Sequence, residues 1–370
     1  MNIKGGDMDS KEIELQLQKL RQKIDKLDRT ILSCLKERYQ IVKEIGVLKR
    51  QLKVSVLDLG RERVVIERVL AQNAGAFPEE ALKAIFLEIV HTCRSAQEPQ
   101  KVAYLGPEAT FSHMAAIKFF GHAADFCPQE SVLDVFEETE AGRTNFGVVP
   151  VENSIEGTVS TTLDAFSEYK LRVCGEVFIP ISHDLLNQTG RKEDIKKVLS
   201  HPHALAQCRR WLRKNLPSVP VEEVSSTAFA ARWAAVDPSV AAIASPLAAR
   251  TYHLQVVAKN IEDFRGNVTR FWVIGKESPA PTGQDKTSLF FSIPDRPGAL
   301  HEVLSCFAQR GINLSKIESR PAKSEPWRYF FFLDCEGHAQ EEPVSSCLIE
   351  LEKICAHLEW LGSYPAGEEI

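Results

Sequence analysis

The stretch VAYLGPEATFS, residues 102–112, joins a short β-rich run to a helical pattern through a loop that carries hydroxyl side chains. An apolar run that ends at Gly-Pro is typical of a buried strand. The same order recurs four more times between residues 101 and 276, which predicts an α/β layer fold for this segment. The loops after the other runs are ENSIEGT (152–158), SHPH (200–203), SST (225–227) and Ser245-Pro246.

These loops predict a cleft for an anion. Helix N-termini present free N–H groups, and ligands of open α/β sheets gather beyond the carboxyl ends of the strands. Simple helix capping is the alternative for any one loop taken alone. His201, His203 and Cys208 lack the further well-spaced ligand of a metal site, and no Walker or G-x-G-x-x-G motif is present. We therefore expect no metal and no nucleotide.

Composition narrows the class of protein. The 370 residues allow two or three domains, and a net charge of −5 gives no overall basic field for nucleic acid. There is no apolar run that could span a membrane, and the first ten residues lack the apolar core of a signal peptide. Nine cysteines without a C-x-x-C pair indicate reduced thiols. These features predict a cytoplasmic protein without nucleic-acid or membrane partners.

Residues 8–97 are expected to be entirely helical. Apolar residues repeat at alternating spacings of three and four from Ile13 to Leu48, which is a heptad seam. At ~1.5 Å per residue this helix would be about 55 Å long. A small domain cannot bury such a helix, so we expect a partner helix from a second copy.

One cation interrupts this seam. Arg38 occupies a seam position, and Lys49 lies within roughly 20° of it at about 100° per residue. The next helix is expected to start at Ser55, with Asp58 and Glu62 on one face. Two interpretations stay open: structural ion pairs between these cations and acids, or a pocket for a small dianion.

Residues 287–370 follow a linker at 276–286 that is rich in proline and polar residues. The order strand, helix, strand, strand, helix, strand is ferredoxin-like. Fold alone says little about function.

The first segment resembles the all-helical chorismate mutase family in LRQKID (20–25), LKERYQIVKEIGVLK (35–49) and DLGRER (58–63). The resemblance implies two interlocked chains that rearrange chorismate to prephenate. It implies a borrowed arginine at Arg21, carboxylate contacts from Arg38 and Lys49, ether-oxygen donors in Lys49 and Gln97, and ring-hydroxyl contacts from Glu62 with Asp58. Arg61 matches a supporting position, and Cys93 stands where the family usually has serine.

The middle segment, 101–276, resembles prephenate dehydratase in YLGPEATFSHMAA (104–116), VVPVENSIEGTV (148–159), SHPHALAQC (200–208) and NVTRFWVIG (267–275). The resemblance implies a two-lobed α/β domain like a periplasmic binding protein. It makes Thr269 the donor to the departing hydroxide, and Arg270 either a carboxylate ligand or a support for the strand end. The substrate-binding positions that it implies are Thr110, Ser112, Glu152, Asn153, Ser200, His201, Gln207, Thr227, Arg270 and Phe271.

The last segment resembles the phenylalanine-sensing ACT domain in PGAL (297–300) and ESRP (318–321). The amino-acid site would lie at a chain interface. The residues that the resemblance assigns to it are Gly298, Ala299, Leu300, Glu318, Ser319, Arg320 and Pro321.

Together these resemblances predict a bifunctional chorismate mutase/prephenate dehydratase that needs no cofactor and that L-phenylalanine inhibits. Both end segments call for a partner, so at least a homodimer is expected. Two alternatives stay open. An arogenate dehydratase differs by an amino group on the substrate, and a sensing protein would bind ligands without turnover.

Overall fold

The computed structural model describes residues 10–52, 54–321 and 329–368. The predicted outer domain limits, residues 8 and 370, lie outside these ranges. The chain forms two compact units: one contains the described residues up to Val56 with Thr92–Pro99, and the other contains Leu57–His91 and the described residues from Gln100 onward. No helix in the described part of the chain is both long and apolar enough to cross a membrane.

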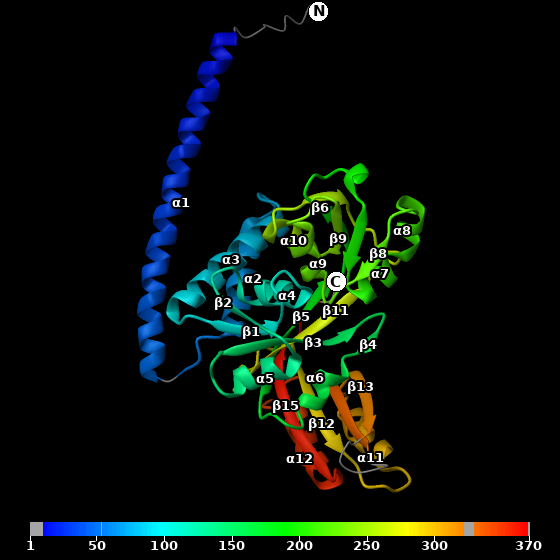
Figure 1. Cartoon of the computed structure of the whole chain (residues 1–370). Coiled ribbons are helices and arrows are strands. Elements are labelled where there is room, and N and C mark those ends of the chain that lie inside the picture. Colours follow the sequence, from blue (N-terminus) through cyan, green and yellow to red (C-terminus); the bar gives the residue numbers. More distant parts are fainter. Residues whose placement is uncertain (1–9, 53, 322–328, 369–370) are drawn as a thin grey trace, which may run out of the picture. The chain divides into compact units, whose positions relative to one another are not determined.

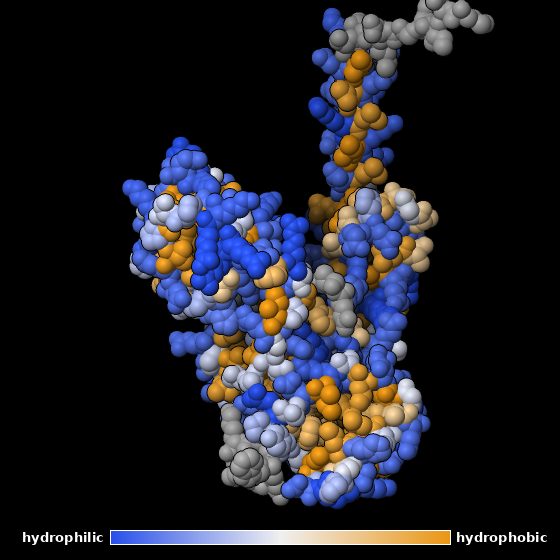
Figure 2. Space-filling model, turned by 90° about the vertical axis from the view of Figure 1, so that its right-hand side faces the viewer, coloured by the Kyte–Doolittle hydropathy of each residue, from blue (hydrophilic) through white to orange (hydrophobic). Residues whose placement is uncertain are grey.

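The first unit is built on α1, a helix of 43 residues over Ser10–Leu52. Its heptad seam is exposed, with 54% of Leu20, 56% of Ile24 and 62% of Leu27 accessible. Figure 2 shows apolar residues in a line along this helix. Burial of apolar surface contributes about 25 cal/mol per Å², so a helix that covers this line would be strongly stabilising. The partner helix itself stays a prediction.

The end of α3 (Glu79–Gln97) packs against α1 at a glycine. A Cβ at Gly46 would lie 2.8 Å from Gln97 Cα, so only glycine allows the two helices to approach this closely. Arg50 adds a hydrogen bond of 3.1 Å to the Gln97 carbonyl.

Helix α2 (Leu59–Asn73) begins later than predicted. Residues 54–58 are not helical, and the Asp58 carboxylate caps the helix by accepting the Arg61 N–H at 2.9 Å. The predicted start at Ser55 is therefore wrong, because the side chain that satisfies the first free N–H groups is Asp58. The Ser55 carbonyl instead accepts a hydrogen bond from Lys49.

The second unit contains the two-lobed α/β domain (Figure 1). In the first lobe β1 pairs in parallel with β2 and β3, and β11 lies antiparallel between β3 and β5. The elements of this lobe are β1 (Lys101–Leu105), α4 (Phe111–Phe120), β2 (Asp125–Gln129), α5 (Val132–Glu140), β3 (Phe146–Asn153), β4 (Gly157–Thr158), α6 (Ser160–Ala165), β5 (Arg172–Pro180) and β11 (Val268–Gly275).

The second lobe has a sheet of order β10-β6-β9-β7-β8 with its own apolar cores. The chain crosses between the lobes twice, after β5 and before β11. The elements of this lobe are β6 (Asp184–Asn187), η1 (Lys192–Asp194), β7 (Lys197–Ser200), α7 (Pro202–Gln207), α8 (Arg209–Asn215), β8 (Val221–Glu223), α9 (Thr227–Ala234), β9 (Val240–Ala244), α10 (Pro246–Thr251) and β10 (Gln255–Ala258).

The C-terminal domain confirms the predicted ferredoxin-like order, in a sheet β13-β14-β12-β15. Its first strand starts inside the predicted linker, because the Asp285 carboxylate accepts hydrogen bonds from Thr282 and Gly283 and fixes that turn. The elements are β12 (Asp285–Ser292), α11 (Ala299–Gln309), β13 (Leu314–Pro321), β14 (Tyr329–Glu336), α12 (Val344–Ile354) and β15 (His357–Pro365).

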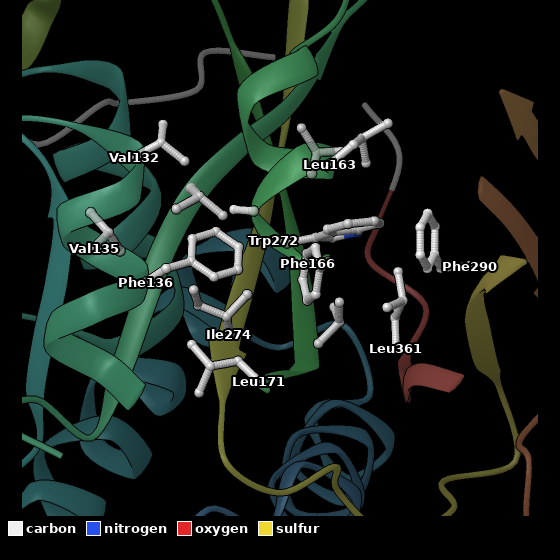
Figure 3. Packing of buried hydrophobic residues seen from close by; sticks show 14 of the residues in the cluster. Val132, Val135, Phe136, Leu163, Phe166, Leu171, Trp272, Ile274, Phe290 and Leu361 are labelled. Atoms are coloured by element: carbon white, nitrogen blue, oxygen red, sulfur yellow. The ribbon is translucent and has the colours of Figure 1, made fainter. Parts of the chain in front are cut away.

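Strand β11 has two differently used faces, since successive side chains of a strand point to opposite sides. Phe271 and Val273 pack into one core of the first lobe with residues of β1 and α4. Trp272 and Ile274 pack on the other side in a core that also contains residues of the C-terminal domain. Figure 3 shows Trp272 between the side chains of the first lobe and Phe290 of β12. The C-terminal domain therefore packs directly against this strand.

Candidate active site

A cavity of about 380 Å³ lies between the two lobes. Its wall combines the ends of β1 and β3 and the start of β11 in the first lobe with the starts of α7 and α9 in the second lobe. The described residues that line it are Leu105, Gly106, Thr110, Phe111, Ser112, Glu130, Asn153, Glu156, Ile181, His183, His201, His203, Ala204, Gln207, Ser225, Ser226, Thr227, Asn267 and Thr269.

The Thr269 hydroxyl accepts a hydrogen bond, and its proton has no acceptor among the residues that the structure describes. The Asn153 amide donates to Thr269 Oγ1 at 2.8 Å and to Asn267 Oδ1 at 2.7 Å. Asn153 Oδ1 accepts the N–H groups of Ile155 and Glu156, both at 3.0 Å, which fixes the orientation of the amide. The Thr269 hydroxyl thus accepts from the protein and can donate into the cavity.

Gln207 connects this group to the second lobe. Its Oε1 lies 2.9 Å from His183 Nε2 and 3.4 Å from Asn267 Nδ2, and its Nε2 donates to Glu156 at 3.2 Å. Because Oε1 only accepts, His183 carries its proton on Nε2. His183 Nδ1 is buried and has no hydrogen-bond partner among the described residues. Burial lowers the pKa of His183, so the imidazole is neutral near pH 7.

Three helices begin at the cavity wall, and the side chain that caps each of them lines the cavity. Thr110 caps α4, and its hydroxyl lies 3.1 and 3.0 Å from the Leu105 and Pro107 carbonyls. Ser226 caps α9, the helix that begins at Thr227. His201 caps α7, and burial, together with the neighbouring His203, lowers its pKa.

The cavity wall is poor in fixed positive charge. None of the described residues that line it is Lys or Arg, and both carboxylates, Glu130 and Glu156, are on the wall. Glu156 is engaged by His203 Nδ1 at 2.7 Å. The attraction for an anion must then come from the N-termini of α4 and α9 and from neutral hydroxyl, amide and imidazole donors.

The structure brings seven of the predicted dehydratase residues together on this wall. They are Thr110, Ser112, Asn153, His201, Gln207, Thr227 and Thr269.

Arg270 and Glu152 do not line the cavity, and their predicted contact with substrate needs correction. Arg270 is 7% exposed and its guanidinium binds Glu176 and Asp334 on the opposite face of β11. Glu152 binds Lys316 at 2.7 Å. The physical reason is the alternation of side chains along a strand: when Thr269 and Asn153 face the cavity, their neighbours face away.

Phe271 and Ser200 also lie outside the wall. The Phe271 side chain is buried in the core beneath the cavity. The buried Ser200 hydroxyl donates to the Ile243 carbonyl at 2.6 Å. Both residues therefore stabilise the lobes and do not contact a ligand in this cavity.

Five of the predicted mutase residues belong to the first unit, and four of them, Arg38, Lys49, Cys93 and Gln97, lie where α1 crosses the end of α3. The Arg38 guanidinium donates to Cys93 Sγ. Lys49 Nζ donates to the Ser55 and Val56 carbonyls at 3.2 and 3.4 Å. Gln97 lies against Gly46, and its Oε1 has no hydrogen-bond partner within the described ranges.

The remaining mutase positions are placed separately. Arg21 is exposed on α1. Asp58, Arg61 and Glu62 belong to the second unit, where Asp58 caps α2 and Arg61 and Glu62 lie in its first turn.

The predicted phenylalanine residues lie at the start of α11 and along β13. Gly298 has φ +83 at the helix start, a conformation that favours glycine. Ser319 and Pro321 are exposed, on the opposite side of β13 from Glu318 and Arg320. Ala299 is buried and Leu300 partly buried. The Arg320 guanidinium instead contacts Ser160 and Asp164 of α6, so it faces the catalytic lobe.

The lining residues that were not predicted as site residues include His183, Asn267, Glu156 and Ser226. Asn267 and Glu156 stand inside quoted motifs, and Ser226 stands in the loop SST, so a broader reading of those loops would have included them. His183 lies on the first crossover between the lobes, where no periodic pattern marks it.

Comparison with known proteins accounts for all three parts. Family models for chorismate mutase type II, prephenate dehydratase and the ACT domain match residues 20–98, 102–279 and 287–353. The crystal structure of a prephenate dehydratase from Arthrobacter aurescens in complex with L-Phe is 39% identical, with a TM-score of 0.66 over 72% of this chain and 90% of that chain. The domain order and the fold are thus those of an ACT-containing dehydratase with a fused mutase.

Full-length relatives give the family. A bifunctional chorismate mutase/prephenate dehydratase from Aquifex aeolicus is 49% identical over 95% of this chain and 98% of that protein. A bifunctional relative from Pseudomonas aeruginosa is 42% identical over 95% and 98%. The chain belongs to the family of bifunctional chorismate mutase/prephenate dehydratases, as the sequence motifs predicted.

Proposed function

We propose that this chain converts chorismate to prephenate at residues 8–97 and prephenate to phenylpyruvate at residues 101–276, under feedback control by L-phenylalanine through residues 287–370. The observation that carries the dehydratase proposal is the Thr269 hydroxyl, which accepts from Asn153 at 2.8 Å and is free to donate into the cavity. The location proposed for the enzyme is the cytoplasm.

The dehydration step breaks two bonds of prephenate. The bond to the carboxylate breaks as CO₂ leaves, and its electron pair completes the aromatic ring. The ring hydroxyl departs as hydroxide, which takes up one proton from solvent to become water. Thr269 donates a hydrogen bond to the departing oxygen, where negative charge develops. The N-termini of α4 and α9 bind the carboxylates, which explains how a dianion is held without Lys or Arg on the described wall.

The mutase step needs no nucleophile. Arg38 and Lys49 hold the two carboxylates of chorismate, and Lys49 and Gln97 donate to the ether oxygen as its bond breaks. Glu62 with Asp58 holds the ring hydroxyl. Arg21, which is exposed on α1 outside the seam, reaches the site of a second copy, so the proposed active form is at least a homodimer.

The proposed regulatory site follows the resemblance to the ACT domain. The solved relative from Arthrobacter aurescens is a complex with L-Phe. In this chain Gly298 to Leu300 and Glu318 to Pro321 would receive phenylalanine at a chain interface. Ser319→Ala should relieve inhibition of dehydration, and Ser345→Ala on α12 serves as the control.

One assay tests the activities. Purified chain receives chorismate, and the products are identified by mass. Phenylpyruvate supports the proposal, prephenate alone would remove the dehydratase, and unchanged chorismate would leave only a sensing protein. A parallel assay compares prephenate with arogenate; a higher kcat/KM for arogenate would replace the proposed substrate.

A further inference from the structure

Two neighbouring rungs of the β3–β11 ladder face opposite sides of the first lobe. In the first rung Asn153 pairs with Thr269, and both side chains line the cavity. In the next rung Glu152 pairs with Arg270, and both side chains contact the C-terminal domain. One residue step along each strand thus separates the proposed donor from the regulatory domain.

Glu152 is bound by the strand that carries the proposed phenylalanine residues. Lys316 of β13 lies 2.7 Å from Glu152 and 3.4 Å from Thr158 Oγ1, and its side chain is only 10% exposed. Arg320, four residues further on the same face of β13, contacts α6. The face of β13 that carries Lys316 and Arg320 therefore packs against the end of β3 after Val151 and against α6.

Arg270 is bound by strands β14 and β15 of the regulatory sheet. Its guanidinium lies 2.6 Å from Asp334 of β14 and 3.0 Å from the Tyr364 hydroxyl of β15. Glu176 of β5 is 2.6 Å away on the same side. The side chains of Arg270, Glu176 and Asp334 are 8%, 0% and 3% exposed, so these contacts are shielded from solvent.

The apolar contact next to this rung makes the connection rigid. Trp272 packs in one core with Phe290 and Leu361 of the regulatory domain, as Figure 3 shows. Packed interiors transmit displacement because they have little free volume. A shift of β13 or β14 must therefore move the Glu152–Arg270 rung or break its ion pairs.

We propose that the Glu152–Arg270 rung couples the regulatory domain to the dehydratase cavity, with Lys316 and Asp334 as positioning residues that act through it on Asn153 and Thr269. The regulatory part of this inference rests on the proposed feedback by phenylalanine. Misplacement of a catalytic group by ~1 Å can cost 10²-fold in rate, so a small shift of the rung is sufficient for control.

The test uses the full chain with Lys316→Met, which removes the cation and keeps a side chain of similar length. The matched control is Arg310→Met, because Arg310 forms an ion pair with Glu350 at 2.5 Å entirely inside the regulatory domain. Lys316→Arg keeps the charge and should behave like the wild type. Prephenate turnover is measured against phenylalanine concentration, and phenylalanine binding is measured separately by calorimetry.

We expect Lys316→Met to bind phenylalanine as the wild type does while the coupling between binding and turnover falls at least about fivefold. Without phenylalanine its kcat should fall while its KM is retained. Arg310→Met should change neither property. The inference is overturned if Lys316→Met is inhibited like the wild type, or if inhibition is lost only because phenylalanine no longer binds.

The two proposals fail in different ways. A wild type that phenylalanine does not inhibit would refute the proposed feedback. The kcat of Lys316→Met relative to Arg310→Met then decides the positioning role alone, and an unchanged kcat would overturn it. A melting curve for each variant confirms that the folded fraction is equal in every assay.

Discussion

Replacement of Arg270 by leucine tests whether this residue contacts substrate in the cavity or stabilises the opposite face of β11. The guanidinium neutralises two buried carboxylates, Glu176 and Asp334, and lies over the Trp272 ring at 5.6 Å. Arg270→Leu keeps the strand and much of the apolar contact but removes the charge. The loss should therefore appear first in stability, and not in the affinity for substrate.

The magnitude follows from the partners that are left. Glu176 keeps Lys286 at 3.0 Å and the Gly367 N–H at 2.8 Å, whereas within the described ranges Asp334 keeps neutral donors such as Ser288 at 2.6 Å. Removal of one partner from a buried ion pair costs about 3–5 kcal/mol. At roughly 2–4 °C per kcal/mol, the unfolding midpoint should fall by about 6–20 °C. Because Lys286 still neutralises Glu176, we expect a fall in the lower half of that range.

Thermal unfolding followed by tryptophan fluorescence measures this loss, because Trp272 lies beside the substituted residue. Kinetics are measured at a temperature where all variants are folded. We expect the KM for prephenate to stay near the wild-type value in Arg270→Leu. Arg270→Lys, which keeps the charge but loses the planar fork, should recover part of the stability. A normal midpoint combined with a tenfold or larger rise in KM would refute the structural role and return Arg270 to the cavity.

Three further predictions concern the two sites and pH. Thr269→Val should lower the dehydration kcat by about 10²–10³, as expected for one lost donor to a developing negative charge, with stability and mutase turnover unchanged. Arg38→Ala should abolish conversion of chorismate to prephenate and spare the dehydration of supplied prephenate. Burial holds the pKa of His183 below its ordinary value of 6.5, so the unfolded chain binds more protons than the folded chain just below that pH. The contribution of neutral His183 to the free energy of unfolding is therefore complete above about pH 6.5 and is lost as the pH falls below that value. His183→Gln has no imidazole to protonate, so it should lose less stability in acid than the wild type.

Each of these predictions has a matched check. Thr269→Ser keeps a hydroxyl and should retain most of the activity that Thr269→Val loses. Equal loss of both activities in Arg38→Ala would contradict the division into separate sites. His122→Gln changes a histidine whose side chain is 74% exposed, and unfolding midpoints between pH 5 and 8 should follow the wild type. If His183→Gln followed it too, the burial argument would be wrong.

The order of the three parts could be predicted because each has a distinct period in its apolar residues. The heptad seam of α1, the strand–helix alternation of the lobes and the last βαββαβ pattern are local signals. The start of α2 was missed for an equally local reason. Ser55 and Asp58 are both good caps, and sequence alone does not decide which one the chain uses.

The assignment of Glu152 to the cavity failed, and so did the carboxylate-ligand alternative for Arg270, because a motif does not specify which face of a strand each residue occupies. A motif groups residues that are adjacent in sequence, whereas a strand sends adjacent residues to opposite sides. Alternation alone predicts that Thr269 and Arg270 diverge. It does not say which face is covered by Asp334, 64 residues further along the chain, and which is left open to a ligand.

The division of charge between the two faces of the β3–β11 ladder has a chemical reason. A fixed cation in the cavity would attract substrate and transition state alike, which lowers KM without raising kcat. Neutral donors such as Thr269 and Asn153 instead gain strength as charge develops on the departing oxygen. The strong charges of Arg270 and Glu152 are placed one step away, where they join the strands to the regulatory domain. The same alternation that misled the motif assignment thus lets one pair of strands serve catalysis on one face and control on the other.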